Sequence, residues 1–314
     1  MANWRNNLKN EMFITIDSGG SKTKLSLYDS DNVLIKNGSA GGFALAIDSD
    51  FVHPELVSVL KGFCACDRIS VAVCNLGGRN KRQIEATLKH VFPNAIVNVF
   101  REAEGNVGIA LCNKYDAQAT LMAGTGSIVI APAGENVVIY GGWGANVSDA
   151  GSGYQLGLDA IRLALSELDG LDPLSELTKR LTGKSAPSAP MKQSEFCKYR
   201  DSARDAMAPY DRAHIASYAK TVYECARAGD IKAQALYDKT GKDLAQNVLS
   251  AVKKSGQGLK NLVVTGGMVR AREFWMESFE KTLKDEHSLE NVYYIADGIS
   301  DAMEEMIKNT KGEK

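Results

Sequence analysis

Short apolar runs alternate with polar turns over the first 35 residues of the chain. The run 12–16 ends in a stretch rich in glycine and hydroxyl residues at 17–23, and alternating apolar positions then flank a turn at 29–32. Apolar runs bounded by Gly, Ser and Asp are typical of β-strands joined by tight turns. The pattern therefore predicts three consecutive strands, the first of which ends at Asp17.

A second copy of this pattern begins near position 119. The apolar run 120–123 leads into a turn rich in glycine at 124–127, and two further runs flank the turn 133–136. The glycine turns lie 106 positions apart, which aligns Gly20 with Gly126. Repetition of one supersecondary unit across a chain indicates two duplicated lobes.

The remaining pattern alternates buried strands with amphipathic helices, which is typical of an α/β fold. Strands are expected at 69–73, 95–100, 262–264 and 292–295. Helices are expected at 84–92, at 158–168, over a long stretch that ends near 256, and at 299–307. Residues 183–195, which are rich in Ser, Pro, Lys and Gly, are predicted to form a surface loop.

The composition restricts the class of partner. Lys plus Arg (37) nearly balance Asp plus Glu (38) in 314 residues, so no net basic charge exists to hold nucleic acid or an anionic membrane. No apolar stretch reaches membrane-spanning length, and the run before Asp17 is too short for a signal-peptide core. Six cysteines without zinc-site spacing favour buried thiols in a reducing compartment. We therefore expect a cytoplasmic protein with a small-molecule partner.

The two glycine turns are candidates for binding phosphate. Glycine lacks a Cβ and tolerates positive φ, so backbone N–H groups in such a turn can approach an anion closely. Either turn alone is equally compatible with a tight hairpin that binds nothing. Their equivalent places in duplicated lobes favour a pair of turns that holds one phosphate chain.

These segments together resemble the BadF/BadG/BcrA/BcrD ATPases and N-acetylglucosamine kinases of the actin, Hsp70 and sugar-kinase superfamily. Residues 14–24 and 122–128 look like the two phosphate motifs, and 263–268 looks like the adenosine motif. The stretch 141–154 is similar to the Gly-Gly-Trp-Gly and Gly-Asp-Glu-Gly-Ser signatures of hexosamine kinases. The matches follow the order of the family over 13–308.

The resemblance implies two RNase H-like lobes, each with a mixed five-stranded sheet, and a central cleft for ATP and its acceptor. The first lobe is expected to comprise 1–117 and 298–314, and the second, with a helical insertion, 118–297. The hinge is expected near 116–119 and 295–298, where closure would exclude water from the transferring phosphoryl group.

The resemblance also assigns the nucleotide-binding residues. The phosphate contacts would come from Gly19, Gly20, Ser21, Lys22, Thr125 and Gly126, and the adenosine contacts from Gly266, Gly267 and Arg270. Mg²⁺ takes carboxylate and phosphate oxygens, and Asp17 is the candidate ligand. Asp17 is alternatively a turn-initiating cap, and Arg270 a solvated cation at a helix end.

Glu102 occupies the position of the family's catalytic Asp, which accepts the proton of the acceptor hydroxyl. The family has an Asn-Asp or Thr-Asp pair here, and this chain has Arg101 and Glu102. The extra methylene moves the carboxylate by about an ångström, which matters for a near-attack geometry. Glu102 is alternatively a charge that interacts with a helix N-terminus.

The predicted acceptor contacts are Ser127, Ile128, Gly142, Trp143, Gly144 and Asp149. Trp143 offers either a flat face to a pyranose or packing in a bend rich in glycine. Two departures weaken the assignment of the sugar: Ser148 and Ala150 replace the Gly and Glu of the hexosamine signature, and Ala44 lies in the loop where the family has a sugar-binding Asn.

The sequence thus predicts an ATP- and Mg²⁺-dependent kinase acting on a hydroxyl of an amino sugar, N-acetylglucosamine or a glucosamine-like sugar, at O6. The alternatives are a BadF-type ATPase that uses a [4Fe–4S] cluster, or a regulator that responds to nucleotide or sugar without kinase activity. The cysteines fall outside the segments expected for a cluster. The departures at Glu102 and Ala44 favour the regulator, and a homodimer is left open.

Overall fold

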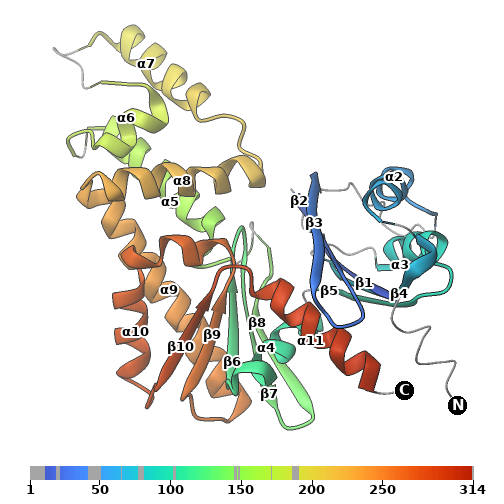
Figure 1. The fold of residues 1–314 in the computed structure, drawn as a ribbon. Helices are drawn as coiled ribbons and strands as arrows, with labels where there is room; N and C mark the ends of the chain where they lie inside the picture. Colours follow the sequence, from blue (N-terminus) through green and yellow to red (C-terminus); the bar gives the residue numbers. More distant parts are fainter. Residues whose placement is uncertain are drawn as a thin grey trace, which may run out of the picture. The chain divides into compact units, whose positions relative to one another are not determined.

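The computed structural model divides into two compact units, Met1–Tyr115 with Asp297–Lys314, and Asp116–Ala296 (Figure 1). It describes residues 11–18, 22–41, 51–64, 66–76, 81–101, 104–144, 147, 149–170, 172–185 and 191–312. Each unit contains one five-stranded sheet, and both sheets are mixed, as predicted.

The sheet of the first unit has the order β3-β2-β1-β4-β5. Its strands are β1 (Met12–Ser18), β2 (Lys22–Tyr28), β3 (Leu34–Gly41), β4 (Ile69–Leu76) and β5 (Ile96–Arg101). The first three form an antiparallel meander, and β4 and β5 run parallel to β1. Asp17 therefore lies at the end of a central strand, opposite Asn75 of β4.

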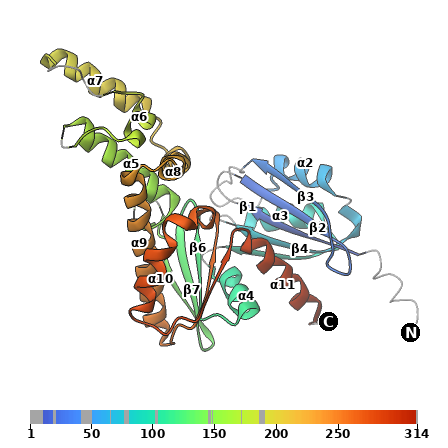
Figure 2. The same cartoon turned by 60° about the vertical axis from the view of Figure 1, so that its left-hand side comes forward.

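Helices cover both faces of this sheet (Figures 1 and 2). They are α2 (Pro54–Phe63), α3 (Lys81–Val91), α4 (Asn106–Tyr115) and α11 (Gly298–Gly312), with the short 3₁₀ helix η1 (Cys66–Arg68). Ile14 and Ile16 of β1 face the core under α2 and α3, whereas Phe13 faces Met303 and Ile307 of α11. The alternation along β1 thus explains why a helix from the end of the chain belongs to the first unit.

The second unit repeats the same sheet topology, with the order β10-β9-β6-β7-β8. Its strands are β6 (Ala119–Ala123), β7 (Ser127–Ala133), β8 (Asn136–Gly141), β9 (Asn261–Thr265) and β10 (Asn291–Ile295). Strands β6 to β8 form the antiparallel meander, and β9 and β10 run parallel to β6. The glycine turn 124–126 thus follows β6, at the position in the second unit that residues 19–21 have in the sequence after β1.

The insertion of the second unit is helical. Its helices are α5 (Gly153–Leu168), α6 (Glu176–Thr182), α7 (Gln193–Ala206), α8 (Arg212–Arg227), α9 (Ile231–Ser255) and α10 (Met276–Lys284), with the 3₁₀ segment η3 (Gly267–Phe274). Helix α9 ends at Gly256, as expected. The predicted loop 183–195 is too long, because α7 starts at Gln193, where the carboxylate of Glu195 accepts from the N–H of Lys192 at 3.1 Å.

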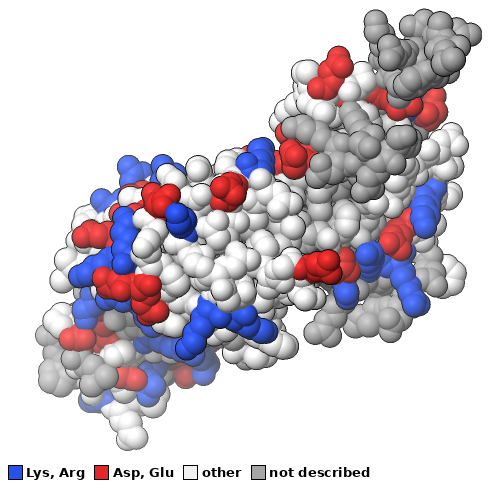
Figure 3. Space-filling model, turned by 90° about the horizontal axis from the view of Figure 1, so that it is seen from below, with Lys and Arg blue, Asp and Glu red and all other residues white. Residues whose placement is uncertain are grey.

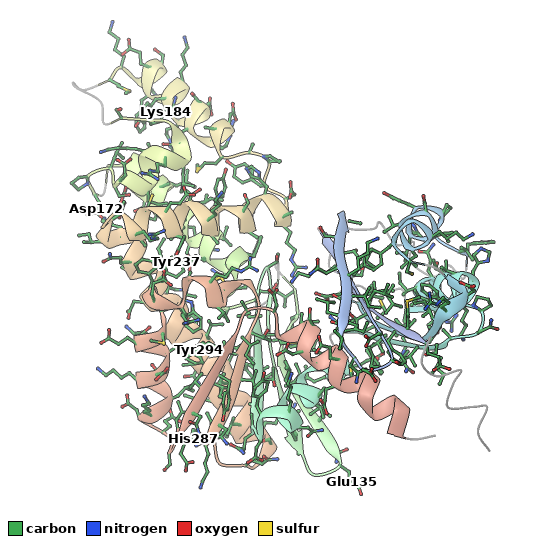
Figure 4. All side chains as sticks on the ribbon, in the orientation of Figure 1. Glu135, Asp172, Lys184, Tyr237, His287 and Tyr294 are labelled. Atoms are coloured by element: carbon green, nitrogen blue, oxygen red, sulfur yellow. The ribbon has the colours of Figure 1, made fainter. Side chains whose placement is uncertain are left out.

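Aromatic side chains fill the core beside α9 and α10. The ring of Tyr237 stacks on Phe274 at 5.6 Å, and Trp275 meets Tyr294 edge to face at 5.8 Å. Figure 4 labels the two tyrosines, which extend from α9 and from β10. These contacts hold η3, and with it the end of the adenosine motif, against the sheet.

The surface carries charges of both signs. On the face that Figure 3 shows, basic and acidic side chains are interspersed. Among the described residues, no helix combines the length and the apolar character needed to cross a membrane.

Candidate nucleotide and acceptor site

The second glycine turn is held by the N-terminus of α5. The N–H of Gly153 donates to the carbonyl of Gly124 at 2.8 Å, and the N–H of Tyr154 donates to the carbonyl of Thr125 at 3.2 Å. Within the turn, the N–H of Gly124 donates to the carbonyl of Gly126 at 2.8 Å. Because the first turn of a helix has N–H groups without intrahelical partners, α5 uses them here to fix the turn in one conformation.

Gly126 lies against two charged side chains. A Cβ on Gly126 would be 2.9 Å from Nη2 of Arg212 and 3.1 Å from Oδ2 of Asp149. Any larger residue would displace one of them. A residue predicted to bind phosphate and a residue predicted to bind the acceptor are therefore direct neighbours in this unit.

Asp149 is a buried carboxylate, with 2 % of its side chain exposed. Its Oδ2 accepts from Nη2 of Arg212 at 3.3 Å, and the backbone N–H groups of Ser127 and Gly144 also donate to the carboxylate. Burial raises the pKa of Asp149, while Arg212 and the two N–H groups act in the opposite direction. In this conformation Arg212, rather than Asp149, presents polar groups to solvent.

The adenosine motif adjoins the same turn. Gly266 follows β9 with φ 103° and ψ 178°, and a Cβ there would be 2.4 Å from the carbonyl oxygen of Ala123. Gly267 follows, and its nitrogen is 3.9 Å from the position of a Cβ on Gly124. Arg270 lies on η3 and is exposed. The two motifs that the sequence assigned to phosphate and adenosine thus meet at one end of the second sheet.

The predicted acceptor residues of β7 and β8 are mostly internal. The hydroxyl of Ser127 donates to the carbonyl of Ala150 at 2.7 Å, and Ile128 is 6 % exposed. The N–H of Gly142 donates to the carbonyl of Ser127 at 2.9 Å. These contacts support the bend rather than leave side chains open to a ligand.

Trp143, by contrast, is 75 % exposed, which contradicts the packing alternative for this side chain. It lines a cavity of about 460 Å³. The other lining residues are Gly144, Val147, Tyr154, Tyr210, Asp211 and Arg212. Aromatic faces beside polar groups are typical of sites that bind a ring-shaped polar ligand.

Tyr210, Asp211 and Arg212 were not predicted from the sequence. They form the start of α8, where the carboxylate of Asp211 accepts from the N–H of His214 at 2.9 Å. An Asp before a helical stripe signals an N-cap, which would have placed the start of α8. Nothing local indicates that this helix start lies beside Gly126.

In the first unit, Asp17 is held by the neighbouring strand. Its Oδ1 accepts from Nδ2 of Asn75 at 3.0 Å, and it pairs across the sheet with Lys24. Lys24 in turn forms an ion pair with Asp297. Burial raises the pKa of Asp17, and Asn75 and Lys24 oppose this rise.

The surroundings of Asp17 fit a hard cation. Asn75 is 3 % exposed, and its Oδ1 has no hydrogen-bond donor within reach in the described part of the chain. A buried amide oxygen beside a carboxylate can take a water ligand of Mg²⁺, which keeps several waters when it binds a nucleotide. The described residues contain no cluster of three metal-ligating side chains, so phosphate oxygens would complete this site.

Several predicted residues lie outside the described residues: Gly19, Gly20, Ser21 and Glu102, together with Ala44 of the departing loop. Of Lys22 only the backbone is described, at the start of β2. Their roles remain predictions.

Glu104 lies two residues after Glu102 and is engaged in ion pairs. Its carboxylate accepts from Nε of Arg101 at 3.0 Å and from Nζ of Lys81 at 3.4 Å. Burial alone would raise the pKa of Glu104, but the two cations hold it below its usual value. Arg101, at the position of the family's Asn or Thr, therefore forms an ion pair with Glu104.

The sequence profile of the BadF/BadG/BcrA/BcrD ATPase family matches residues 14–304. The chain belongs to this family. An N-acetyl-D-glucosamine kinase of Dictyostelium discoideum is 23% identical over 313 residues, which cover 89% of this chain and 92% of that protein. The family membership rests on the whole length of the fold and not on one motif.

Solved structures show the same fold. A candidate N-acetylglucosamine kinase from Chromobacterium violaceum superposes with a TM-score of 0.66 at 20% identity, over 95% of this chain and 99% of that one. A ROK-family glucokinase from Streptomyces griseus, solved with glucose and AMPPNP, has a TM-score of 0.56 at 12% identity, over 93% and 97% of the two chains. This BadF-family chain therefore has the architecture found in sugar kinases.

Proposed function

We propose that this BadF-family protein is an ATP-dependent kinase that phosphorylates a hydroxyl of an amino sugar. The observation that carries the proposal is that the phosphate turn, the adenosine motif and a cavity meet at one end of the second sheet. There the fixed turn at Gly124–Gly126 adjoins both the adenosine motif at Gly266 and a cavity with aromatic walls. The similarity to N-acetylglucosamine kinases supports the same function.

The phosphates of ATP are assigned to the two glycine turns. Thr125 and Gly126 contribute from the second unit and Ser21 from the first, with Gly266 and Gly267 beside the adenosine. Asp17 and Asn75 would hold Mg²⁺ through carboxylate and water contacts. The bound ion would neutralise charge on the β- and γ-phosphates.

Glu102 is proposed as the general base. In the transfer, an acceptor hydroxyl oxygen forms a bond to the γ-phosphorus while the bond from phosphorus to the β–γ bridging oxygen breaks. The hydroxyl proton passes to the carboxylate of Glu102, and ADP leaves with the electron pair of the broken bond. Such a base contributes about a hundredfold to ten-thousandfold in rate.

The acceptor is assigned to the cavity beside Trp143. Its exposed indole offers a flat apolar face, which suits the axial C–H groups of a pyranose. N-acetylglucosamine or a glucosamine-like sugar, phosphorylated at O6, is the proposed substrate because relatives with this fold are N-acetylglucosamine kinases. A small primary hydroxyl also enters a phosphoryl site with little steric hindrance.

The test is ADP release measured by a coupled assay over a panel of hexoses, hexosamines and N-acetylhexosamines, with the phosphorylated position determined by NMR. Glu102→Gln should lose most turnover while retaining Mg-ATP binding. Glu102→Asp should also be slower if the active site has adjusted to the longer side chain. Trp143→Ala should raise the KM of the sugar, and Tyr140→Ala, which changes another exposed aromatic residue of the same unit, should not.

Nucleotide binding without phosphorylation of any sugar on the panel would instead support the regulator. Turnover by Glu102→Gln equal to that of the wild type would remove Glu102 from the mechanism. A cluster-dependent ATPase would need several thiolates within reach of iron; of the described cysteines, Cys197 is exposed, and Cys64, Cys74, Cys112 and Cys225 are buried.

A further inference from the structure

Arg212 is the first residue of α8, and its side chain extends to the second phosphate turn. Its Nη2 lies 2.9 Å from the position of a Cβ on Gly126, which is within contact distance of the turn's backbone. The residues are far apart in sequence, so the tertiary fold alone creates this contact. A guanidinium beside a turn proposed to bind phosphate is placed to meet an anion.

A buried carboxylate keeps the guanidinium at this position. A cation in the first turn of a helix is unfavourable because the N-terminus carries the positive end of the helix dipole. The buried carboxylate of Asp149 compensates, since its Oδ2 is 3.3 Å from Nη2 of Arg212. Asp149 is itself held by backbone N–H groups of Ser127 and Gly144. The buried carboxylate of Asp149 therefore positions the guanidinium of Arg212.

The guanidinium also faces the cavity. Its side chain is 53 % exposed, and it is the cation among the residues that line the space beside Trp143 and Tyr210. The second charged lining residue, Asp211, uses its carboxylate to cap α8. A guanidinium has five N–H donors, and Asp149 engages one of its nitrogens. The remaining donors are available for oxygens of a ligand in the cavity.

We infer that Arg212 is a catalytic residue that donates hydrogen bonds to the non-bridging oxygens of the transferring phosphoryl group, with Asp149 as its positioning residue. The inference rests on the proposed kinase function. Arg212 stays protonated throughout, while the acceptor oxygen bonds to the γ-phosphorus, the bond to the bridging oxygen breaks and the general base takes the hydroxyl proton. Its location between turn and cavity matches the junction of nucleotide and acceptor.

The first experiment compares nucleotide affinities by calorimetry in the wild type, Arg212→Ala and Arg212→Lys. The wild type should bind Mg-AMPPNP more tightly than Mg-ADP, and Arg212→Ala should lose about tenfold of this preference because ADP lacks the γ-phosphate. Arg212→Lys should keep part of it, since lysine retains the charge but not the planar fork. Arg227→Ala, which removes an exposed arginine at the other end of α8, is the matched control and should bind like the wild type.

The second experiment measures turnover with the best sugar of the panel. Removal of one oriented donor to a developing charge lowers kcat by about a hundredfold to a thousandfold, and the same loss is expected for Arg212→Ala. Added guanidine should restore part of the activity of this variant, which a merely structural role would not allow. Asp149→Asn should lower kcat more than it raises the KM of the sugar, because Asp149 acts through Arg212.

The outcomes separate the two proposals. If AMPPNP binds but no sugar is phosphorylated, the kinase proposal fails, and the ratio of AMPPNP to ADP affinity still decides the role of Arg212. An unchanged ratio in Arg212→Ala overturns the inference, as does a variant whose only defect is a raised KM for the sugar. If Arg212→Ala does not fold, the ratio of AMPPNP to ADP affinity and the kcat are measured for Arg212→Lys and compared with the wild type.

Discussion

Replacement of Gly266 by alanine should destabilise the second unit more than any other single methyl addition at its glycine turns. Gly266 has φ 103° and ψ 178°, a region that only glycine occupies readily, and a side chain there costs about 1–3 kcal/mol. The added Cβ would also lie 2.4 Å from the carbonyl oxygen of Ala123, whereas ordinary contacts begin at 3.4 Å. Strands β6 and β9 would have to separate by about 1 Å to relieve the overlap.

This separation affects the centre of the sheet. Met122 and Thr265 are partners in the parallel ladder one residue before the overlap, so the shift weakens hydrogen bonds that each contribute about 0.5–1.5 kcal/mol. The strain and the loss of two such hydrogen bonds together give about 2–6 kcal/mol. Domains are typically stable by about 5–15 kcal/mol, so this loss is a large fraction of the total. We expect the nucleotide affinity to fall as well, because the same strands carry both motifs.

The assay is urea-induced unfolding with two matched controls. Gly256→Ala introduces a methyl group at φ 73° with no atom within 4 Å, so it isolates the cost of the backbone conformation, about 1 kcal/mol. Gly267→Ala lies next to Gly266, has no positive φ and meets no atom within 4 Å, and should change stability by less than about 0.5 kcal/mol. A loss for Gly266→Ala within about 1 kcal/mol of that for Gly256→Ala would refute the steric argument.

Two further predictions concern the buried polar residues. Asn75→Ala should weaken Mg-AMPPNP binding by about tenfold or more, since a hydrogen bond to a charged group contributes about 1.5–3 kcal/mol. Calorimetry at several Mg²⁺ concentrations measures the affinity, and Asn98→Ala is the control. An unchanged affinity in Asn75→Ala would contradict the prediction. Folding raises the pKa of Asp149, so the native state binds more protons than the unfolded state and loses stability as pH rises above the ordinary value of 3.8. The free energy of unfolding of Asp149→Asn, relative to wild type, should therefore increase from below pH 3.8 toward neutral pH and then level off, and a flat difference would show that the pKa is not raised.

The central strands could be predicted because each is an apolar run between residues that stop it, whereas β2 and β3 are more polar and were identified by their turns. The run 120–123, for example, ends at a glycine turn, and β6 ends at Ala123. The duplication was visible for the same reason, since both meanders use similar turns. The start of α7 was missed because Lys192 stands at the N-cap, where Ser, Thr, Asp or Asn would have signalled a helix start.

The sequence predicted which residue types form the candidate site, but not which of their side chains are buried and which are exposed. Motifs identified Asp149 and Trp143 together, but the structure buries one and exposes the other. Burial depends on what packs around a residue, and one of the groups against Asp149 is Arg212 of a distant helix. The contact between Arg212 and Gly126 joins the start of α8 to the turn between β6 and β7. These two segments share no local sequence pattern, so periodicity does not predict the contact.

The duplicated scaffold places different contacts at the ends of β1 and β6, and this difference suits the two units to distinct roles. In the first unit a side chain of the adjacent parallel strand, Asn75, holds the carboxylate of Asp17. In the second unit the N-terminal amides of α5 hold the turn, and Arg212 lies on its outside. One unit thus presents an anion suited to a metal, and the other presents a cation and backbone groups suited to phosphate. Phosphoryl transfer requires both, since it depends on positioned charge more than on covalent chemistry by the protein.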